Sequence, residues 1–496
     1  MAQMSVNGLT FGYEENPELV FDRVNFSVDT DWKLGLVGRN GKGKTTFLRL
    51  LRGELEYGGS IVCPEETEAF PWTVERGNRP AIEVMEERAP GCELWRVCVE
   101  LEELGLSSDV LYREYETMSP GEQTKLQLAV LFSREHCYLL LDEPTNHLDW
   151  ESREQLGEYL KKKKGFLLVS HDRALLDACT DHILAFNREG IQVERGNFST
   201  WWENRRRRES FEESQDRKLR REMRQLQEAA ARTEGWSDQV EKSKKGQGAG
   251  GAKVDRGYVG HKAAKMMKRS LVIRERSQTA LEEKKKLLKN REEQEPLKIF
   301  PLQPPREIVL SMRKVSLGYG ERTVLEEFSL EVKRGERILL LGRNGSGKSS
   351  LLQAVRGKLD PQSGVLEMSS GLVISYVPQR TDWMRGSLEE YLESQQADGT
   401  LVRAVLRKLD FSREQFSRRL EELSAGQRKK LLLACSLCSP AHLYLWDEPC
   451  NYVDVFSRMQ LEELLAASGA TMLMVEHDRA FAQRVATRQV RLDIGE

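Results

Sequence analysis

The stretch Leu34–Thr46, with the sequence LGLVGRNGKGKTT, decides the fold of this 496-residue chain. It contains the pattern GxxxxGK[ST], which an apolar run precedes and a helical pattern follows. In that context the pattern forms a loop that binds phosphate groups. Its glycines let backbone N–H groups surround the phosphates, and the N-terminus of the next helix adds the positive end of its dipole. The stretch therefore predicts a nucleotide-binding domain of the α/β class.

An internal repeat extends this prediction to the second half of the chain. LLLGRNGSGKSS at 339–350 repeats the loop, LYLWDEPCNYVD at 443–454 repeats YLLLDEPTNHLD at 138–149, and LMVEHDRA at 473–480 repeats LLVSHDRA at 167–174. Both halves keep the same motif order with almost no relative insertion, as expected of a duplicated unit. We therefore expect two tandem P-loop ATPase domains at 1–203 and 300–496, joined by a linker at 204–299.

Each loop supplies groups that can hold the phosphates of ATP. The lysine provides a mobile positive charge for the β- and γ-phosphates, and the hydroxyl that follows it can hold Mg²⁺. The candidate ATP-binding residues of the loops are Gly38, Asn40, Gly41, Gly43, Lys44, Thr45 and Thr46, and in the second copy Gly342, Asn344, Gly345, Gly347, Lys348, Ser349 and Ser350.

A carboxylate ends the strand-like run that follows each loop. Asp142 ends the run CYLLL, and Asp447 ends the run HLYLW. A carboxylate at this position can hold Mg²⁺ through water, together with the hydroxyl of Thr45 or Ser349. The candidate ligands of Mg²⁺ in these motifs are therefore Thr45, Asp142, Ser349 and Asp447.

The candidate catalytic residues follow directly. Glu143 and Glu448 come immediately after the two aspartates and are placed to polarise the attacking water. His171 and His477 end the next strands and could contact the γ-phosphate. A lone histidine is more often structural, but its repetition at matching spacing favours a catalytic role.

Two further stretches resemble a known superfamily. SPGEQ at 119–123 and SAGQR at 424–428 each precede an Asp-Glu pair, and they resemble the signature sequence of ABC ATPases. The resemblance implies that the signature of each domain closes over the nucleotide held by the other, so that a monomer forms an intramolecular dimer with two composite sites. It adds Ser424 and Gly426 to the first site, Ser119 and Gly121 to the second, and Tyr13 and Tyr319 as aromatic residues stacked on adenine. For both tyrosines the alternative is a buried position on a strand.

The two sites depart differently from the family pattern. Gln379, in YVPQR, matches the usual glutamine between loop and signature, and the resemblance implies that it contacts ATP and Mg²⁺ or the attacking water. Its counterpart in EAFPWTV is Trp72, whose indole donates only from one N–H. The first site is therefore expected to hydrolyse ATP differently. Pro120 and Ala425 replace the second signature residue, which is usually glycine.

The middle of the chain is basic, whereas the remainder is acidic. Residues 201–296 contain 26 Lys and Arg against 17 Asp and Glu, which is +9 within a formal net charge of −2. This asymmetry indicates an anionic partner for the middle segment. The alternative is a solvated helical face with salt bridges. We expect a charged helix from residue 204, a return helix at 262–290 and a Gly-rich tip at about 236–262.

Other features indicate a cytoplasmic protein without a membrane span. No apolar run reaches the length of about 18 residues that a span requires, and MAQMSVNGLTFGY has no secretory pattern. The eight cysteines form no small-domain framework and favour reduced thiols. Cys435 and Cys438 lie within an apolar helical pattern and are expected in the core.

DEPTNHLD and the basic linker are similar to the ABC-F family, and matching residues at Trp32–Gly41, Trp446–Phe456 and Lys268–Ser270 resemble its antibiotic-resistance members of the Lsa type. The resemblance implies a ribosome-binding ATPase with ATP and Mg²⁺ as cofactors. Its linker would enter the exit site of the bacterial 70S ribosome, contact 23S rRNA and the tRNA in the peptidyl site, and displace lincosamide, streptogramin A or pleuromutilin antibiotics. The candidate tip residues are Lys253, Val254, Arg256, Tyr258 and His261.

Alternative functions stay open. A housekeeping ABC-F translation factor that relieves stalled ribosomes would share the same motifs, although such members often carry an arm insertion. Lys44 to Ser119 and Lys348 to Ser424 span only 75 and 76 residues, which leaves no room for an arm. The ATPase subunit of a transporter would share the ATP sites. For the linker, the alternative is a disordered segment that contacts nothing.

Overall fold

The computed structural model describes residues 2–14, 19–75, 77–146, 148–187, 190–215, 217–218, 221, 224, 261, 264–265, 268, 272, 275–276 and 297–492. The chain divides into two compact units, Met1–Trp201 with Gln294–Glu496, and Trp202–Glu293. The first unit contains both halves of the repeat. Within the part of the chain that the structure describes, no helix combines the length and apolarity needed to cross a bilayer.

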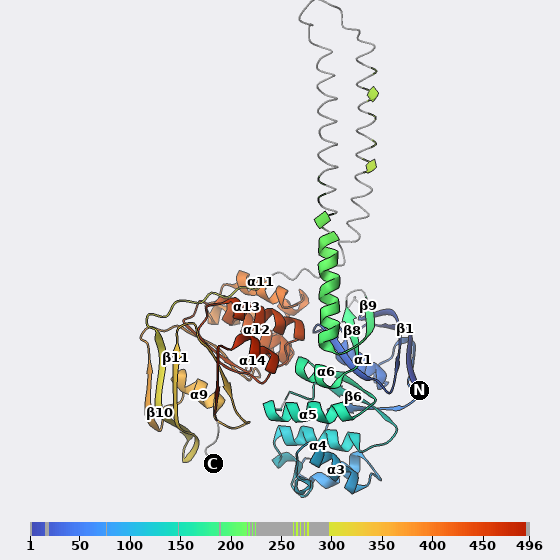
Figure 1. Cartoon of the computed structure of the whole chain (residues 1–496), viewed down its shortest axis with the longest axis horizontal. Coiled ribbons are helices and arrows are strands. Elements are labelled where there is room, and N and C mark those ends of the chain that lie inside the picture. Colours follow the sequence, from blue (N-terminus) through green and yellow to red (C-terminus); the bar gives the residue numbers. More distant parts are fainter. Residues whose placement is uncertain are drawn as a thin grey trace, which may run out of the picture. The chain divides into compact units, whose positions relative to one another are not determined.

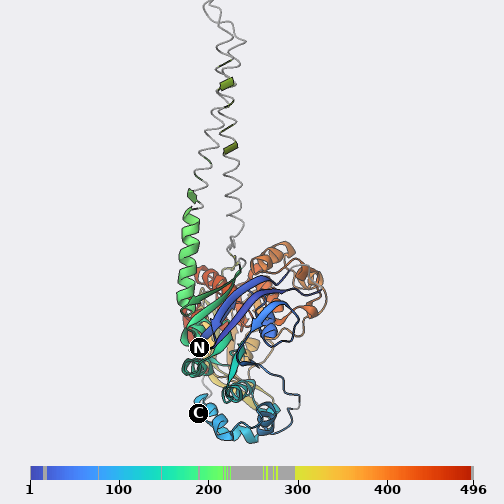
Figure 2. The same ribbon diagram turned by 90° about the vertical axis from the view of Figure 1, so that its right-hand side faces the viewer.

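The first half of the repeat has the following elements: β1 (Gln3–Phe11), β2 (Phe21–Asp29), β3 (Lys33–Gly38), α1 (Lys44–Leu51), β4 (Gly58–Val62), β5 (Glu66–Phe70), α2 (Ala81–Arg88), α3 (Leu94–Glu103), η1 (Ser108–Tyr112), η2 (Tyr115–Thr117), α4 (Pro120–Phe132), β6 (Cys137–Asp142), α5 (Trp150–Lys162), β7 (Phe166–Val169), α6 (Arg173–Cys179), β8 (His182–Asn187) and β9 (Gly190–Arg195). Its antiparallel sheet has the order β2-β1-β4, and its larger sheet has the order β5-β6-β7-β3-β8-β9. Figure 2 shows the antiparallel strands in blue.

The second half repeats this plan with β10 (Ile308–Tyr319), β11 (Arg322–Lys333), β12 (Arg337–Leu341), α9 (Lys348–Val355), β13 (Ser363–Met368), β14 (Ile374–Val377), α10 (Leu388–Ser394), α11 (Gly399–Lys408), η3 (Glu414–Ser417), η4 (Leu420–Glu422), α12 (Ala425–Cys438), β15 (Leu443–Asp447), α13 (Val455–Ala467), β16 (Met472–Val475), α14 (Arg479–Val485) and β17 (Arg488–Arg491). Its sheets have the orders β11-β10-β13 and β14-β15-β16-β12-β17. Helix α9 contacts β10 of the first sheet (Figure 1). It also contacts β15 and β16 of the second sheet. The mixed α/β class and the tandem repeat are therefore confirmed.

The larger sheets place the candidate residues at one edge. In the first half β3 pairs in parallel with β7, and β7 pairs in parallel with β6. These strands are short apolar runs, because both faces of a parallel sheet are covered. Since carboxyl ends of parallel strands share an edge, the loop after β3, Asp142 at the end of β6 and the residues after β7 come together. The second half repeats the arrangement with β12, β15 and β16.

The core also receives the cysteine pair of α12. Cys435 and Cys438 are buried among apolar residues of the second half, and both thiols are free. Burial raises the pKa of Cys435 to about 12 and that of Cys438 to about 11. The predicted core position is confirmed.

The second unit begins with helical residues 202–215. Arg205 Nε lies 2.9 Å from Glu209 Oε1, and Arg207 Nη2 lies 3.6 Å from Glu203 Oε2. Part of the basic segment thus carries ion pairs along a helix, as expected if its charges form a solvated helical face with salt bridges. Apart from His261, the predicted Gly-rich tip lies outside the described residues, including Lys253, Val254, Arg256 and Tyr258, and so does most of the return helix. His261 is described and is an exposed helical residue.

Candidate functional site

The two phosphate loops connect a buried strand to a helix. Gly43 and Gly347 occupy the N-cap positions of α1 and α9 with φ values of 87° and 88°, a left-handed conformation that favours glycine. Neither helix start has a side-chain cap. The first backbone N–H groups of each helix therefore remain available for an anion, and the helix dipole favours negative charge there.

The loop lysines point back into their loops. Lys44 Nζ donates to Gly38 O at 2.7 Å, and Lys348 Nζ donates to Gly342 O at 2.7 Å. Both side chains are buried, and burial lowers the pKa of each ammonium. Each loop thus holds a buried cation, bonded to backbone carbonyl groups, beside the uncapped start of a helix, which suits a polyphosphate.

The hydroxyl and carboxylate predicted to hold Mg²⁺ are adjacent in each half. Thr45 Oγ1 donates to Asp142 Oδ2 at 3.3 Å, and the Ser349 side chain forms a hydrogen bond with the Asp447 carboxylate. Burial raises the pKa of Asp142 and raises that of Asp447 to about 6. The buried Oδ1 atom of Asp447 accepts no hydrogen bond from any described residue.

These donors fit Mg²⁺, which binds few protein ligands and keeps waters and substrate phosphates in its shell. The unpartnered Oδ1 of Asp447 is the atom that a bound cation would satisfy. Within the described ranges, no group of three or more His, Cys, Asp or Glu is placed to hold a metal. A cage built from protein side chains alone is therefore not part of the described site.

The candidate catalytic glutamates share an unusual backbone conformation. Glu143 and Glu448 have φ values of 50° and 46°, in the left-handed region. Their N–H groups donate at 2.9 Å to Val169 O and Val475 O, which end the neighbouring strands. The chain turns sharply at each glutamate and is held there by the adjacent strand, so the carboxylate is fixed beside the loop.

Each histidine lies against its glutamate. His171 Nε2 is 3.4 Å from Glu143 Oε1, and His477 Nε2 is 3.8 Å from Glu448 Oε1. Burial lowers the pKa of His171 well below its usual value and lowers that of His477 to about 3. Both imidazoles are therefore neutral near pH 7, with one N–H donor and one acceptor nitrogen each.

Residues from both halves form the cavity at the second loop. A cavity of about 360 Å³ is lined by Lys348, Ser349, Gln379, Glu448 and His477 of the second half. It is also lined by Pro120, Asn146, Leu148 and Arg153 of the first half. Pro120 lies between the signature residues Ser119 and Gly121, so the structure brings the first signature to the second phosphate loop.

At the first loop, the contacts between the halves involve other residues. Asn40 Nδ2 donates to Tyr452 O at 3.1 Å, and Arg458 Nη1 donates to His171 O at 2.9 Å. Ser424 Oγ instead accepts from Gln427 N at 3.3 Å and caps α12. Arg39 of the first loop also forms an ion pair with Asp410, which follows α11. The second half thus reaches the first loop through Asp410 and through the segment after its Asp-Glu pair, and the described contacts do not join Ser424 or Gly426 to that loop.

The signature serines have a structural role as well. Ser119 Oγ accepts from Glu122 N at 3.3 Å, and Ser119 N donates to Glu122 Oε2 at 2.7 Å, which forms a capping box at α4. Ser424 forms the same box with Gln427 at α12. In each box the hydroxyl oxygen accepts, so its own proton is available to a phosphate oxygen.

The predicted adenine-stacking residues are exposed. Tyr13 and Tyr319 retain 41% and 58% of their accessible surface, which contradicts the alternative of buried strand positions. Tyr13 Oη lies 3.0 Å from Thr46 Oγ1, and Tyr319 Oη lies 3.3 Å from Ser350 Oγ. Each ring is therefore accessible beside the helix that begins at a phosphate loop.

Gln379 and Trp72 have different surroundings. Gln379 Nε2 donates to Glu448 Oε1 at 2.8 Å, so it touches the candidate catalytic carboxylate. Trp72 is half-buried, and its backbone N–H donates to Gln127 Oε1 at 3.3 Å. The Arg88 guanidinium lies 5.8 Å from the centre of its ring, and the indole N–H has no hydrogen-bond partner among the residues that the structure describes. In the described structure, Glu143 therefore has no hydrogen bond equivalent to the one that Glu448 accepts from Gln379.

Sequence reasoning missed Lys429. Its side chain is 1% exposed, and Nζ donates to Pro378 O at 2.7 Å, Asp447 O at 2.9 Å and Gln379 O at 3.4 Å. Burial lowers the pKa of Lys429 to about 8. One ammonium thus ties the segment of Gln379 to the end of β15. The equivalent residue of the first half is Thr124, whose Oγ1 donates to Pro120 O at 2.9 Å.

The comparison with protein families matches both halves. The model of the family described as ABC transporter matches residues 21–146 and 325–451, which together form about half of the chain. These segments include both phosphate loops, both signature stretches and both Asp-Glu pairs.

Two curated relatives match almost the whole chain. The ribosome protection protein VmlR of Bacillus subtilis is 28% identical over 499 residues, which cover 95% of this chain and 84% of VmlR. The energy-dependent translational throttle protein EttA of Haemophilus influenzae is 27% identical over 509 residues, which cover 92% of this chain and 86% of EttA.

A solved structure has the same fold. It is reported as the crystal structure of the complex of the archaeal ribosomal stalk protein aP1 and the archaeal ribosome recycling factor aABCE1. The TM-score is 0.63 at 20% identity, and the match covers 98% of this chain and 87% of that one. At this identity the likeness concerns the fold alone.

Proposed function

The chain belongs to the ABC transporter family and is an ATPase, and from this premise we propose that it acts on the bacterial ribosome as an ABC-F protein. In this proposal it protects the ribosome from lincosamide, streptogramin A and pleuromutilin antibiotics of the peptidyl transferase centre. The linker enters through the tRNA exit site, contacts 23S rRNA and the tRNA in the peptidyl site, and displaces the drug. The protein works in the cytoplasm as a monomer.

One observation carries the proposal. Two ATP sites flank a segment with a charge balance of +9, while the rest of the chain is acidic. A basic segment of this kind neutralises nucleic-acid phosphates and releases their counterions. The match to the relative named as a ribosome protection protein spans 95% of this chain and so extends into the middle segment. The combination favours a ribosomal RNA partner over a membrane partner.

Different residues of each site have different roles in hydrolysis. At the second site the Glu448 carboxylate accepts a proton from water while the water oxygen attacks the γ-phosphorus and the bond to the leaving ADP oxygen breaks. Gln379 orients that carboxylate through its 2.8 Å hydrogen bond. The neutral His477 donates a hydrogen bond to the γ-phosphate. Ser349, Asp447 and Gln379 would hold Mg²⁺ at this site, where the ion would supply charge neutralisation.

The first site uses Lys44, Thr45, Asp142, Glu143 and His171 in the same roles. Its nucleotide is closed in by Ser424 and Gly426 when the two halves approach. The second site is closed by Ser119 and Gly121, and Tyr13 and Tyr319 stack on the two adenines. Closing requires ATP because the signature hydroxyls bond the γ-phosphate, which ADP lacks. Ribosome binding then follows the closed state.

A panel of inhibitory concentrations tests this function. A susceptible bacterium that expresses the chain is expected to tolerate higher concentrations of the three drug classes, and cells with a chain carrying Lys44→Ala and Lys348→Ala are not. Unchanged susceptibility at normal expression would exclude the resistance function. That outcome would favour a translation factor, which the name of the relative EttA supports as the second candidate.

The two sites are expected to turn over at different rates. In the Glu143→Gln variant the catalytic glutamate of the second site remains, and Gln379 orients it. In the Glu448→Gln variant only the first site keeps its catalytic glutamate, and Trp72 stands there in place of the glutamine. We therefore expect the Glu143→Gln variant to retain the larger share of phosphate release. Equal steady-state rates of the two single variants would remove the basis for this asymmetry.

Lys429→Met is expected to slow the second site. The change leaves the carbonyl groups of Pro378 and Asp447 unpaired and loosens the segment of Gln379, and a displacement of about 1 Å at a reacting centre can cost roughly a hundredfold in rate. Phosphate release should be measured in the Glu143→Gln background, which isolates this site. Thr124→Val is the matched control in the first half. If Lys429→Met and Thr124→Val release phosphate equally fast, Lys429 has no part in positioning Gln379.

A further inference from the structure

A second cavity lies beside the second ATP site but does not belong to it. Its volume is about 540 Å³, within the range typical of small-molecule sites. Helix α9, which starts at the phosphate loop, supplies Gln353, and the segment after it supplies Arg356. Pro378 links the cavity to the ATP site, because its neighbour Gln379 lines the other cavity.

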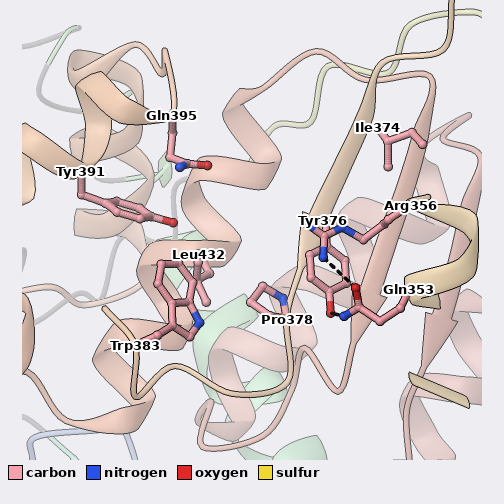
Figure 3. A pocket seen from close by; sticks show the side chains of 9 residues that line it. All are labelled: Gln353, Arg356, Ile374, Tyr376, Pro378, Trp383, Tyr391, Gln395 and Leu432. Atoms are coloured by element: carbon pink, nitrogen blue, oxygen red, sulfur yellow. Dashed lines mark hydrogen bonds between the residues drawn. The ribbon is translucent and has the colours of Figure 1, made fainter. Parts of the chain in front are cut away.

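The cavity has two walls of different chemistry. Figure 3 shows Gln353, Arg356 and Tyr376 on one side of Pro378, and Trp383, Tyr391, Gln395 and Leu432 on the other. Trp383 is 54% exposed, and the centres of the Trp383 and Tyr391 rings are 6.3 Å apart. The second wall thus offers accessible aromatic surface on which a flat group can stack.

The first wall holds a fixed positive charge. The Arg356 guanidinium lies 3.8 Å from the centre of the Tyr376 ring, and Arg356 Nη1 donates to Gln353 Oε1 at 3.0 Å. Gln353 Nε2 in turn donates to Tyr376 Oη at 3.0 Å, which closes the group. No carboxylate of the described residues pairs with Arg356, and none lines the cavity. The charge is therefore preorganised and available to an anion.

The first half of the repeat lacks this arrangement. Arg52, at the position equivalent to Arg356, pairs with Glu54 at 2.7 Å. Ala69 stands where the second half has Tyr376, and Val84 stands where it has Tyr391. The aromatic rings and the unneutralised guanidinium are thus features of the second half and do not follow from the fold that both halves share.

We propose that this cavity, between α9, β14, α10 and α12, binds an unpaired nucleotide of RNA, with its base stacked on Trp383 and its phosphate on Arg356. A nucleotide combines the features that the two walls offer, namely a flat aromatic face, an edge for the Gln395 amide and an anionic group. An acidic peptide would use the guanidinium but leave the aromatic wall unmatched. This inference rests on the proposed function in one respect, namely that the RNA belongs to the ribosome.

Binding of a short RNA tests the cavity without ribosomes. The probe is a fluorescein-labelled oligoadenylate of six nucleotides, titrated with the full chain in saturating ADP and Mg²⁺ so that the ATP sites are filled. An abasic strand of the same length keeps the phosphates and reports binding by the basic linker alone. Fluorescence anisotropy at fixed salt gives the affinity of each variant.

Trp383→Ala is expected to weaken binding of the oligoadenylate roughly tenfold, as the loss of one base stack does. Trp383→Phe keeps a ring and should retain most of the affinity, which separates stacking from a folding defect. Arg356→Gln should also weaken binding and reduce its dependence on salt. The matched controls are Trp95→Ala, since Trp95 is exposed in the first half, and Arg52→Gln.

Two results would overturn the proposal. One is that Trp383→Ala and Arg356→Gln bind the oligoadenylate as tightly as the two controls do, which would leave the cavity to a protein partner. The other is that the abasic strand binds the unaltered chain as tightly as the oligoadenylate. Neither result bears on whether the chain pellets with ribosomes, so failure of this inference and failure of the proposed function are distinguishable.

Discussion

Replacing Glu143 and Glu448 together by Gln is expected to lower ATP hydrolysis by roughly a thousandfold, the scale of a lost general base, while ATP binding is kept. Both carboxylates are fixed beside their loops by the left-handed turn and the N–H bond to the neighbouring strand. An amide fills the same space but cannot accept the proton of water. The loop lysines and backbone N–H groups remain for the phosphates. Phosphate release and filter binding of labelled ATP measure the two quantities.

The matched control is Glu158→Gln with Glu463→Gln. These glutamates lie on α5 and α13 of the two halves and are exposed, with no contact to a phosphate loop. The control should hydrolyse ATP at the unaltered rate. A double Glu143→Gln, Glu448→Gln variant that keeps more than about a hundredth of the turnover would show that another group acts as the base, since even a weak general base contributes about this much.

Shortening the linker between Gly246 and Gly260 is expected to abolish drug protection, so that inhibitory concentrations return to those of cells without the protein. The segment has few apolar residues, so it gains little from folding and its loss should cost little stability. ATP hydrolysis and most ribosome affinity should remain, because the other Lys and Arg residues still contact phosphates. Val254→Ala with Tyr258→Ala should have the same effect, because the tip loses apolar contact at Val254 and stacking at Tyr258.

Phe211→Ala is the control for this experiment. Phe211 is an exposed apolar residue of the described helix in the second unit, at 62% exposure. Its loss should leave protection unchanged. If cells with the shortened linker stay as resistant as cells with the full chain at equal expression, the tip is not the working part, and a general translation role gains support.

The grouping of the candidate ATP-site residues could be predicted because the sequence pattern that marks them is local. A glycine-rich turn between a strand and a helix, and acidic residues at strand ends, appear in the order of the chain, and the repeat provides an internal check. The positions of Lys44, Asp142 and Glu143 at one sheet edge then follow from parallel pairing. Even the difference between Gln379 and Trp72 was visible in the sequence, although the contact of Gln379 with Glu448 was not.

What escaped prediction depends on packing between distant segments. Lys429 lies in a run of helical residues, and its role appears only when three carbonyl groups from two other segments surround it. The approach of Tyr452 to Asn40 depends on how the two halves pack. The cavity lined by Arg356 and Trp383 likewise joins residues from three helices, a strand and loops. No local pattern marks such groupings.

Pelleting with ribosomes tests whether ATP closes the protein on the ribosome. The chain with Glu143→Gln and Glu448→Gln is mixed with purified 70S ribosomes in ATP or in ADP and centrifuged through sucrose, and the pelleted share is measured. We expect this variant to pellet with ribosomes in ATP and largely to stay in the supernatant in ADP, since only ATP would hold the signatures closed. Equal pelleting in the two nucleotides would contradict ribosome binding by the ATP-closed state.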